Sequence, residues 1–152
     1  MNNNKTIDVL NSLIEINQDR IEGYQTATDE TNEIELKGLF STLMRTSEEC
    51  KDELTAEVLR LGGTPQEGTR NTGKIFRVWM DFKAALTGKD RKAILNSCEF
   101  GEDAAVEAYE KVLEDHREDL NYDQTLLVRK QYKLIKNDHD EIRSLRDQFQ
   151  NA

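Results

Sequence analysis

Apolar residues recur three or four positions apart along four long stretches of this 152-residue chain. The stretches cover residues 6–29, 33–61, 90–116 and 123–150. Spacing of this kind places the apolar side chains on one face of an α-helix. The single proline, Pro65, lies between the second and third stretches, so it interrupts none of them. The sequence therefore predicts an all-α protein with one domain over residues 1–152.

Signals for helix ends occur at three of the expected boundaries. Asn32, with Glu35 three residues later, fits a capping box at the start of the second helix. The segment Gly62-Gly63-Thr64-Pro65 predicts a firm end to that helix, because glycine adopts the left-handed cap and proline cannot continue the helix. Asn121 or Asp123 is expected to cap the last helix.

A long connection separates the second helix from the third. Residues 62–73 are rich in glycine and threonine and are expected to form a loop, whereas the very apolar residues 74–86 are expected to form a short helix. This length lets the third helix begin at the far end of the bundle. We expect Trp79, the only tryptophan, to be largely buried. We expect it to pack either against the bundle or against a second subunit, in a homodimer formed through this helix.

Polar residues interrupt the apolar stripes near the middle of each helix: Asn17, Thr46, Glu102 and His139, with Glu49 and Lys136 one turn away from two of them. A buried polar group is costly unless it finds a partner. We therefore expect Asn17, Glu102 and His139 to lie at one level, with Glu102 and His139 interacting directly or through water. Such a layer either fixes the helix register or binds a metal ion such as Fe, Mn or Zn.

A weak internal repeat relates the first helix to the third. Ile21-Glu22-Gly23-Tyr24 resembles Val106-Glu107-Ala108-Tyr109 at an offset of 85 residues. The same offset relates Asn17 to Glu102, so these two polar residues are expected to occupy equivalent places.

Several motifs carry a resemblance to a known family: Ile21-Glu22-Gly23-Tyr24, Leu61-Gly62-Gly63-Thr64-Pro65, Trp79-Met80-Asp81-Phe82-Lys83-Ala84-Ala85-Leu86-Thr87-Gly88 and Gly101-Glu102-Asp103. With these motifs in this order, the chain resembles a small bacterial ferritin-like family, related to rubrerythrin, whose function is unassigned. The resemblance extends over nearly the whole chain. It implies a ferritin-like antiparallel four-helix bundle, with a long crossover and a short helix between helices 2 and 3.

Ferritin-like bundles that hold two metal ions place a Glu on the first and third helices and a Glu-x-x-His on the second and fourth. In rubrerythrin-like proteins a Tyr follows the helix Glu seven residues later. This chain matches with Glu102 and Tyr109 but has Asn17 before Tyr24. The second helix has Thr46-x-x-Glu49 and the fourth has Lys136-x-x-His139. The resemblance thus leaves Glu102 and His139 as metal-ligand candidates, with Glu49 as a substitute.

These departures predict a non-enzymatic bundle of unassigned cellular role with an eroded di-metal site, either stress-related or an interaction protein, and without a cofactor. Asn17, Thr46 and Lys136 favour this interpretation. The alternative is a metal-dependent oxidase, peroxidase or iron-handling protein with Fe or Mn as cofactor, which Glu102 and His139 favour.

Charge and cysteine content limit partners and location. The 30 acidic and 21 basic residues give a formal charge of -9, which disfavours nucleic acids and anionic membranes as partners. No run of 18 apolar residues occurs, and the polar start of the chain does not resemble a secretory signal. Cys50 and Cys98 lie in apolar stripes, without metal-ligand spacing, and suit a reducing compartment. We therefore expect a cytoplasmic protein.

Overall fold

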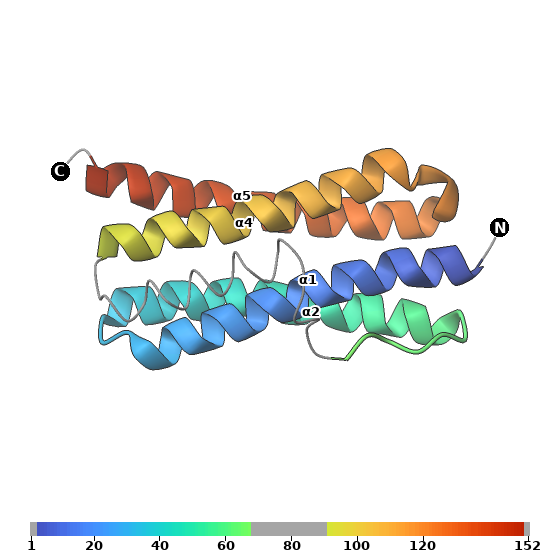
Figure 1. Ribbon diagram of the computed structural model, residues 1–152, viewed down its shortest axis with the longest axis horizontal. Helices are drawn as coiled ribbons and strands as arrows, with labels where there is room; N and C mark the ends of the chain where they lie inside the picture. The colour runs from blue at the N-terminus through green and yellow to red at the C-terminus, as the bar shows by residue number, and fades with distance from the viewer. Residues whose placement is uncertain (1–2, 68–90, 151–152) are drawn as a thin grey trace.

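The computed structural model describes residues 3–67 and 91–150, which form four long α-helices and one short 3-10 helix (Figure 1). The elements are α1 (Asn3–Glu30), α2 (Ile34–Arg60), α4 (Arg91–Asp115), η1 (Arg117–Asp119) and α5 (Tyr122–Gln150). The part of the chain described contains no strand. The all-α prediction is confirmed for the described residues, and each boundary predicted for the four long helices lies within three residues of the observed one. The predicted short helix 74–86 and Trp79 lie outside the described residues.

The four helices form a bundle of two antiparallel hairpins. Helix α1 packs along α2, and α4 packs along α5, while α1 contacts α4 and α2 contacts α5 across the bundle. Helices α2 and α4 run in the same direction, so α4 begins at the end of the bundle opposite to the end of α2 (Figure 1). The long connection between α2 and α4 was expected to allow this arrangement, and the observed direction of α4 agrees with that expectation.

The end of α2 is a double-glycine cap, as the sequence predicted. Gly62 has a φ of 81°, and its N–H donates to the carbonyl of Leu59 at 3.0 Å. The N–H of Gly63 donates to the carbonyl of Val58 at 2.9 Å, which completes a Schellman motif. A Cβ at position 63 would lie 2.8 Å from the side chain of Ile7. Position 62 thus needs glycine for its backbone angle, and position 63 needs it because α1 approaches closely.

The start of α5 confirms one predicted cap, and the start of α2 contradicts another. The N–H of Gln124 donates to Asn121 Oδ1 at 2.8 Å, and the N–H of Asn121 donates to Gln124 Oε1 at 2.9 Å. The capping box expected at Asn32 is wrong, because Glu33 is the N-cap residue and makes no side-chain cap hydrogen bond. The hydroxyl of Thr31 instead accepts the N–H of Glu33 at 3.2 Å. This contact holds the turn so that α2 begins one residue later than the box requires.

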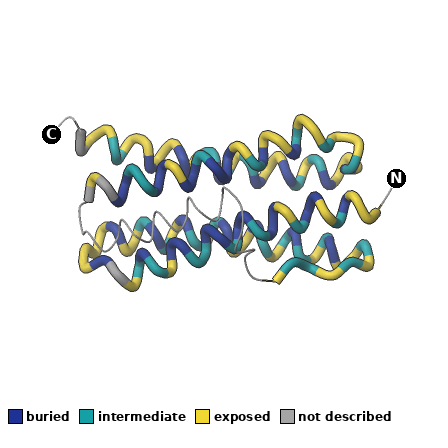
Figure 2. The backbone as a smooth tube through the Cα atoms, in the orientation of Figure 1, coloured by how far each residue is buried: buried dark blue, intermediate teal, exposed yellow. Residues whose placement is uncertain are grey.

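Buried residues recur along all four long helices (Figure 2). They include two apolar clusters, with buried polar residues between them along each helix. One cluster contains Leu10, Leu13, Ile14, Leu54, Val58, Val112, Val128 and Ile135 among its members. The other contains Tyr24, Ala27, Leu36, Phe40, Leu43, Ile94, Leu95, Cys98 and Ile142. On every long helix, a buried polar residue lies between the two apolar groups: Asn17 and Arg20, Ser47, Glu102, and Asp138. These residues form the interior polar layer.

Candidate functional site

Arg20 lies at the centre of the interior polar layer and is completely buried. Its guanidinium donates to Ser47 Oγ at 2.6 Å and to Glu102 Oε1 at 2.7 Å. A third hydrogen bond reaches Asp138 Oδ2 at 3.2 Å. One side chain of α1 therefore contacts α2, α4 and α5 at once, and it joins the two helix hairpins.

In this layer one buried cation, Arg20, pairs with two carboxylates, Glu102 and Asp138. The side chains of Arg20 and Glu102 are both 0% exposed, and that of Asp138 is 12% exposed. Burial alone lowers the pKa of Arg20, but the carboxylates of Glu102 and Asp138 outweigh burial and raise that pKa above its usual value. Burial raises the pKa of Asp138 to about 6, against the lowering effect of Arg20. The hydrogen bonds between these charged groups offset part of the cost of removing them from water.

Two buried tyrosines, one on α1 and one on α4, each form a hydrogen bond with a polar side chain of the other helix. The hydroxyl of Tyr24, on α1, donates to Glu102 Oε1 on α4. Asn17, on α1, donates from Nδ2 to the hydroxyl of Tyr109 on α4 at 2.8 Å. Each tyrosine thus meets the polar residue that precedes the other tyrosine by seven positions. The repeat with an offset of 85 residues is visible here as a pair of matching contacts.

Gln131 extends the network from α4 to α2. The hydroxyl of Tyr109 donates to Gln131 Oε1 at 2.8 Å. The amide of Gln131 donates to the carbonyl of Cys50 at 3.1 Å and to Glu53 Oε1 at 3.3 Å. Within the described part of the chain, three buried side-chain atoms have no hydrogen-bond partner: Asn17 Oδ1, Arg20 Nε and Glu102 Oε2. Buried water commonly satisfies groups of this kind.

The structure buries Asn17 and Glu102 as predicted, but it corrects the partner of Glu102. Glu102 pairs with Arg20 and Tyr24, and it forms no hydrogen bond with His139. His139 is buried, but Nε2 contacts Asp103 Oδ1 at 2.5 Å and Nδ1 contacts Asp140 Oδ1 at 3.1 Å. The prediction of a direct contact is wrong, because a cation from α1 supplies the counter-charge inside the bundle. The alternative of an interaction through water stays a prediction.

The remaining predicted residues are not buried in the polar layer. Glu49 is exposed on α2. Thr46 is only partly buried, whereas its neighbour Ser47 is fully buried, but the side chain of Thr46 still hydrogen-bonds Asp138. Lys136 is 40% exposed and pairs with Asp140. The structure thus brings Glu102 and His139 onto facing helices without joining them, and it leaves Glu49 on the surface.

Sequence reasoning missed Arg20, Ser47, Gln131 and Asp138 as members of the buried network. Arg20 had a usable signal, because it lies three residues after Asn17 and four before Tyr24, on the same side of α1. Ser47 and Asp138 are each one residue away from the predicted Thr46 and His139. A step of one residue turns about 100° around a helix. The spacing of the apolar residues therefore did not decide between Thr46 and Ser47, or between Asp138 and His139.

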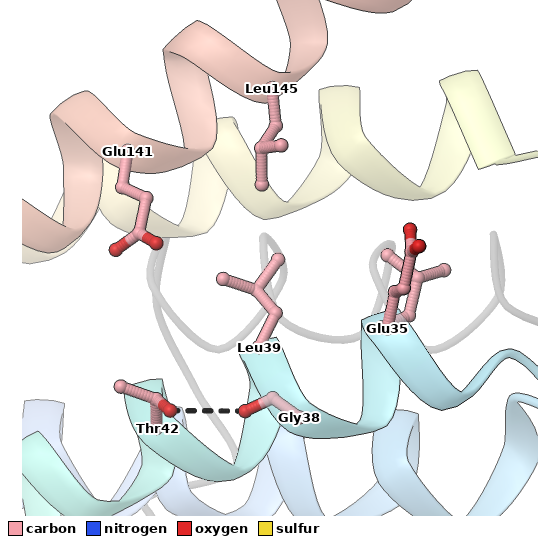
Figure 3. A pocket seen from close by; sticks show the side chains of 7 residues that line it. Glu35, Gly38, Leu39, Thr42, Glu141 and Leu145 are labelled. Atoms are coloured by element: carbon pink, nitrogen blue, oxygen red, sulfur yellow. Dashed lines mark hydrogen bonds between the residues drawn. The ribbon is translucent and has the colours of Figure 1, made fainter.

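A groove of about 320 Å³ lies between α2 and α5 near the end of the bundle (Figure 3). Its lining residues are Glu35, Leu36, Gly38, Leu39, Thr42, Glu141 and Leu145. Thr42 donates its hydroxyl to the carbonyl of Gly38 at 3.0 Å. The titratable groups that line the groove are two carboxylates on exposed residues, Glu35 and Glu141. The lining offers no nucleophile paired with a base.

A family model described as a domain of unknown function (DUF2383) matches residues 5–115, a range that includes nearly all of α1 together with α2 and α4. No curated protein matches the chain. None of the helices in the described part of the chain is both long enough and apolar enough to cross a membrane.

Proposed function

The chain belongs to this family of domains of unknown function, DUF2383, and from that premise we propose that it is a non-enzymatic, ferritin-like bundle that acts by binding other proteins in the cytoplasm. In this proposal the guanidinium of Arg20 takes the place that metal ions hold in ferritin-like enzymes. The observation that carries the proposal is the set of three hydrogen bonds from buried Arg20 to Ser47, Glu102 and Asp138.

The charges of the layer support this proposal. A di-metal centre in a bundle uses about four carboxylates to hold two divalent ions. Among the described residues, the interior polar layer contains two, Glu102 and Asp138, and Arg20 already neutralises part of their charge. A fixed positive charge within hydrogen-bonding distance of both carboxylates repels a divalent cation strongly in a poorly solvated interior.

Asn17 supports the same conclusion. The family pattern places a carboxylate at this position, whereas the Nδ2 of Asn17 donates to the carbonyl of Leu13 and to the hydroxyl of Tyr109, both at 2.8 Å. The amide is held by these two bonds as part of the hydrogen-bonded layer.

Exposed apolar side chains support a binding role. Leu59, Tyr122 and Leu126 are 59%, 77% and 45% exposed. They lie at one end of the bundle, where Gln124 of α5 donates to Glu57 of α2 at 2.9 Å. Contiguous apolar patches mark protein interaction sites, and we propose that these three side chains take part in such a site at this end of the bundle.

The test is metal analysis of protein purified without chelator and without a nickel column. We expect well under one equivalent of Fe or Mn per chain, and no oxygen consumption when Fe(II) is added. A double variant, Asn17→Glu with Arg20→Met, restores one carboxylate and removes the internal cation, so its Fe or Mn content should rise. Arg20→Lys with Asn17→Glu is the matched control, because it keeps a positive charge. Two tightly bound ions in the wild-type protein, with oxygen consumption, would instead establish the metal-dependent oxidase or iron-handling function.

A further inference from the structure

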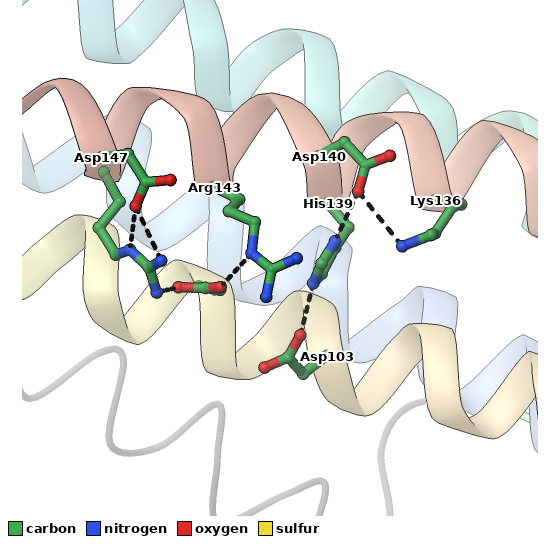
Figure 4. A network of polar contacts seen from close by, with 8 residues as sticks. Asp103, Lys136, His139, Asp140, Arg143 and Asp147 are labelled. Atoms are coloured by element: carbon green, nitrogen blue, oxygen red, sulfur yellow. Dashed lines mark hydrogen bonds and ion pairs between the residues drawn. The ribbon is translucent and has the colours of Figure 1, made fainter.

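His139 of α5 faces two carboxylates on one side of α4, outside the interior polar layer (Figure 4). Glu99 and Asp103 are four residues apart, so both lie on the same face of α4. One ligand atom from each of the three residues lies within 4.8 Å of the other two. The side chains of Glu99 and His139 are 8% and 6% exposed, and that of Asp103 is 46% exposed. Two donors are therefore buried and the third opens to solvent.

The contacts of the imidazole fix which ring nitrogen faces α4. An ionised carboxylate only accepts hydrogen bonds, so the 3.1 Å contact to Asp140 Oδ1 places a hydrogen on Nδ1. Nε2 is then the ring nitrogen that faces Asp103 Oδ1 of α4, and it is the ring atom that can act as a metal ligand.

We propose that Glu99, Asp103 and His139 bind one divalent transition-metal ion of the Zn²⁺ class. One imidazole with two carboxylates is a donor set that suits Zn²⁺. Asp140 holds Nδ1–H and so orients Nε2 towards the ion, as outer carboxylates do for metal-binding histidines.

A hollow beside the three residues provides access for the ion and its water ligands. Its volume is about 270 Å³, and its lining residues are Asn96, Glu99, Phe100, Asp103 and Arg146. Asp103 lies at the rim because nearly half of its side chain is exposed. The ion can therefore enter from solvent without movement of the helices.

Two arginines of α5 contact Glu99 and would compete with the metal. Arg143 Nε lies 3.4 Å from Glu99 Oε1, but the Arg143 side chain is 57% exposed and can turn into solvent. Arg146 also contacts Glu99, yet its Nη2 bonds Asp147 at 2.9 Å as well. Arg146 thus keeps a carboxylate partner when Glu99 turns to the metal. Binding costs a surface rearrangement of side chains, and it leaves Arg20 and Glu102 unchanged.

The experiment is a titration of the whole chain, first freed of metal with chelator and then transferred to chelator-free buffer, with ZnCl2 in a calorimeter. We expect one Zn²⁺ per chain, and at least tenfold weaker binding for Asp103→Asn and for His139→Gln. Asp140→Asn should weaken binding about tenfold or more, because it frees the ring orientation. Asp103 is the more exposed of the two ligands, so Asp103→Asn remains a valid test where His139→Gln disturbs folding. Glu49→Gln is the matched control, an exposed carboxylate outside the site, and its affinity should equal that of the wild type.

Nitrogen-15 NMR of the two histidine rings gives an independent readout. Zn²⁺ should shift the Nε2 signal of His139 and leave Nδ1 protonated, while the ring of His116, paired with Asp119 at 3.0 Å, stays unchanged. No binding in millimolar Zn²⁺, unaltered affinity in Asp103→Asn, or a shift confined to His116 would overturn the proposal. These outcomes are separate from the Fe, Mn and oxygen measurements on the interior layer, so either proposal can fail alone.

Discussion

Arg20 shows what a single residue decides in this bundle. A buried guanidinium is costly to desolvate, and three hydrogen bonds to three other helices offset that cost. The family pattern implied that Glu102 is a metal ligand. Because Arg20 is present, Glu102 forms a salt bridge with it instead. Asp138, one residue before His139, completes the pair of acids. At the scale of residues, the interior polar layer therefore pairs one buried guanidinium with two carboxylates.

Removing Arg20 should strand two buried carboxylates. We expect Arg20→Met to lower the free energy of unfolding by about 3–5 kcal/mol, measured by urea denaturation. Arg143→Met removes an exposed arginine of α5 and should change stability by no more than about 0.5 kcal/mol. Equal effects of the two substitutions would contradict a central role for Arg20.

A double-mutant cycle identifies the partner of Glu102. Arg20→Met and Glu102→Gln should be coupled by roughly 0.5–3 kcal/mol, because these side chains are in contact. Glu102→Gln and His139→Leu should be additive within about 0.5 kcal/mol, because no hydrogen bond joins them. Strong coupling between Glu102 and His139, with none to Arg20, would reverse this assignment.

Asp138 makes stability depend on pH in an unusual direction for an acid. Its folded pKa is about 6, and its unfolded pKa is about 3.9, so between these values the folded state binds more protons. This group therefore contributes stability that is present below about pH 4 and is lost as pH rises through about 6, by no more than about 3 kcal/mol. Urea unfolding from pH 4 to 7 should show Asp138→Asn gaining stability relative to the wild type as pH rises. A constant difference between the two proteins would show that Asp138 does not titrate in this range.

At the scale of elements, the helix ends combine local rules with tertiary contacts. The α2 end is a Schellman motif that the sequence encodes directly, and the reciprocal Asn121–Gln124 pair begins α5. Gly63 adds a tertiary requirement, because α1 packs against it through Ile7. Each of these contacts satisfies backbone groups that a helix end would otherwise leave unpaired.

Two glycines, Gly38 inside α2 and Gly62 just beyond its end, should respond to alanine in opposite directions. Gly62→Ala forces a side chain into the left-handed conformation at φ 81° and should cost about 1–2 kcal/mol. Gly38 lies inside α2, and a Cβ there would meet nothing within 4 Å. Gly38→Ala should therefore stabilise the protein by about 0.5–1 kcal/mol. Thermal unfolding of both variants checks the pair, and a loss of stability at position 38 would show that the helix surface there is occupied.

At the scale of the whole molecule, the interior polar layer divides the core but also connects its parts. The two apolar clusters share no member, while Arg20 joins α1 to the other three helices between them. The bundle is thus two helix hairpins held together by a polar centre and an apolar cluster on each side of it.

Conservative substitutions in the two apolar clusters should show whether each cluster contributes independently to stability. Ile14→Val in one cluster and Ile94→Val in the other should each cost about 0.5–1.5 kcal/mol. Their effects should add within about 0.5 kcal/mol, because the two side chains share no apolar cluster. Both should unfold in a single urea transition when probed by circular dichroism and by near-ultraviolet absorbance. Two separated transitions would mean that the polar layer fails to couple the two ends.

The helices and their ends could be predicted from the sequence, because the rules that set them act over three or four residues. Apolar spacing placed all four long helices, Gly62-Gly63 ended α2, and Asn121 capped α5. Asn17 and Glu102 were correctly expected to be buried, since both interrupt an apolar stripe.

The partners inside the bundle were decided by the tertiary structure. A stripe spaced by three or four residues leaves the rotation of a helix uncertain by about one residue, or about 100°. Packing of the four helices turned Ser47 inward in place of Thr46, and it turned Asp138 towards Arg20 while His139 met Asp103. Which charge faces which depends on the rotation of all four helices together, and on the need of each buried charge for an opposite one, so no single stretch of sequence determines it.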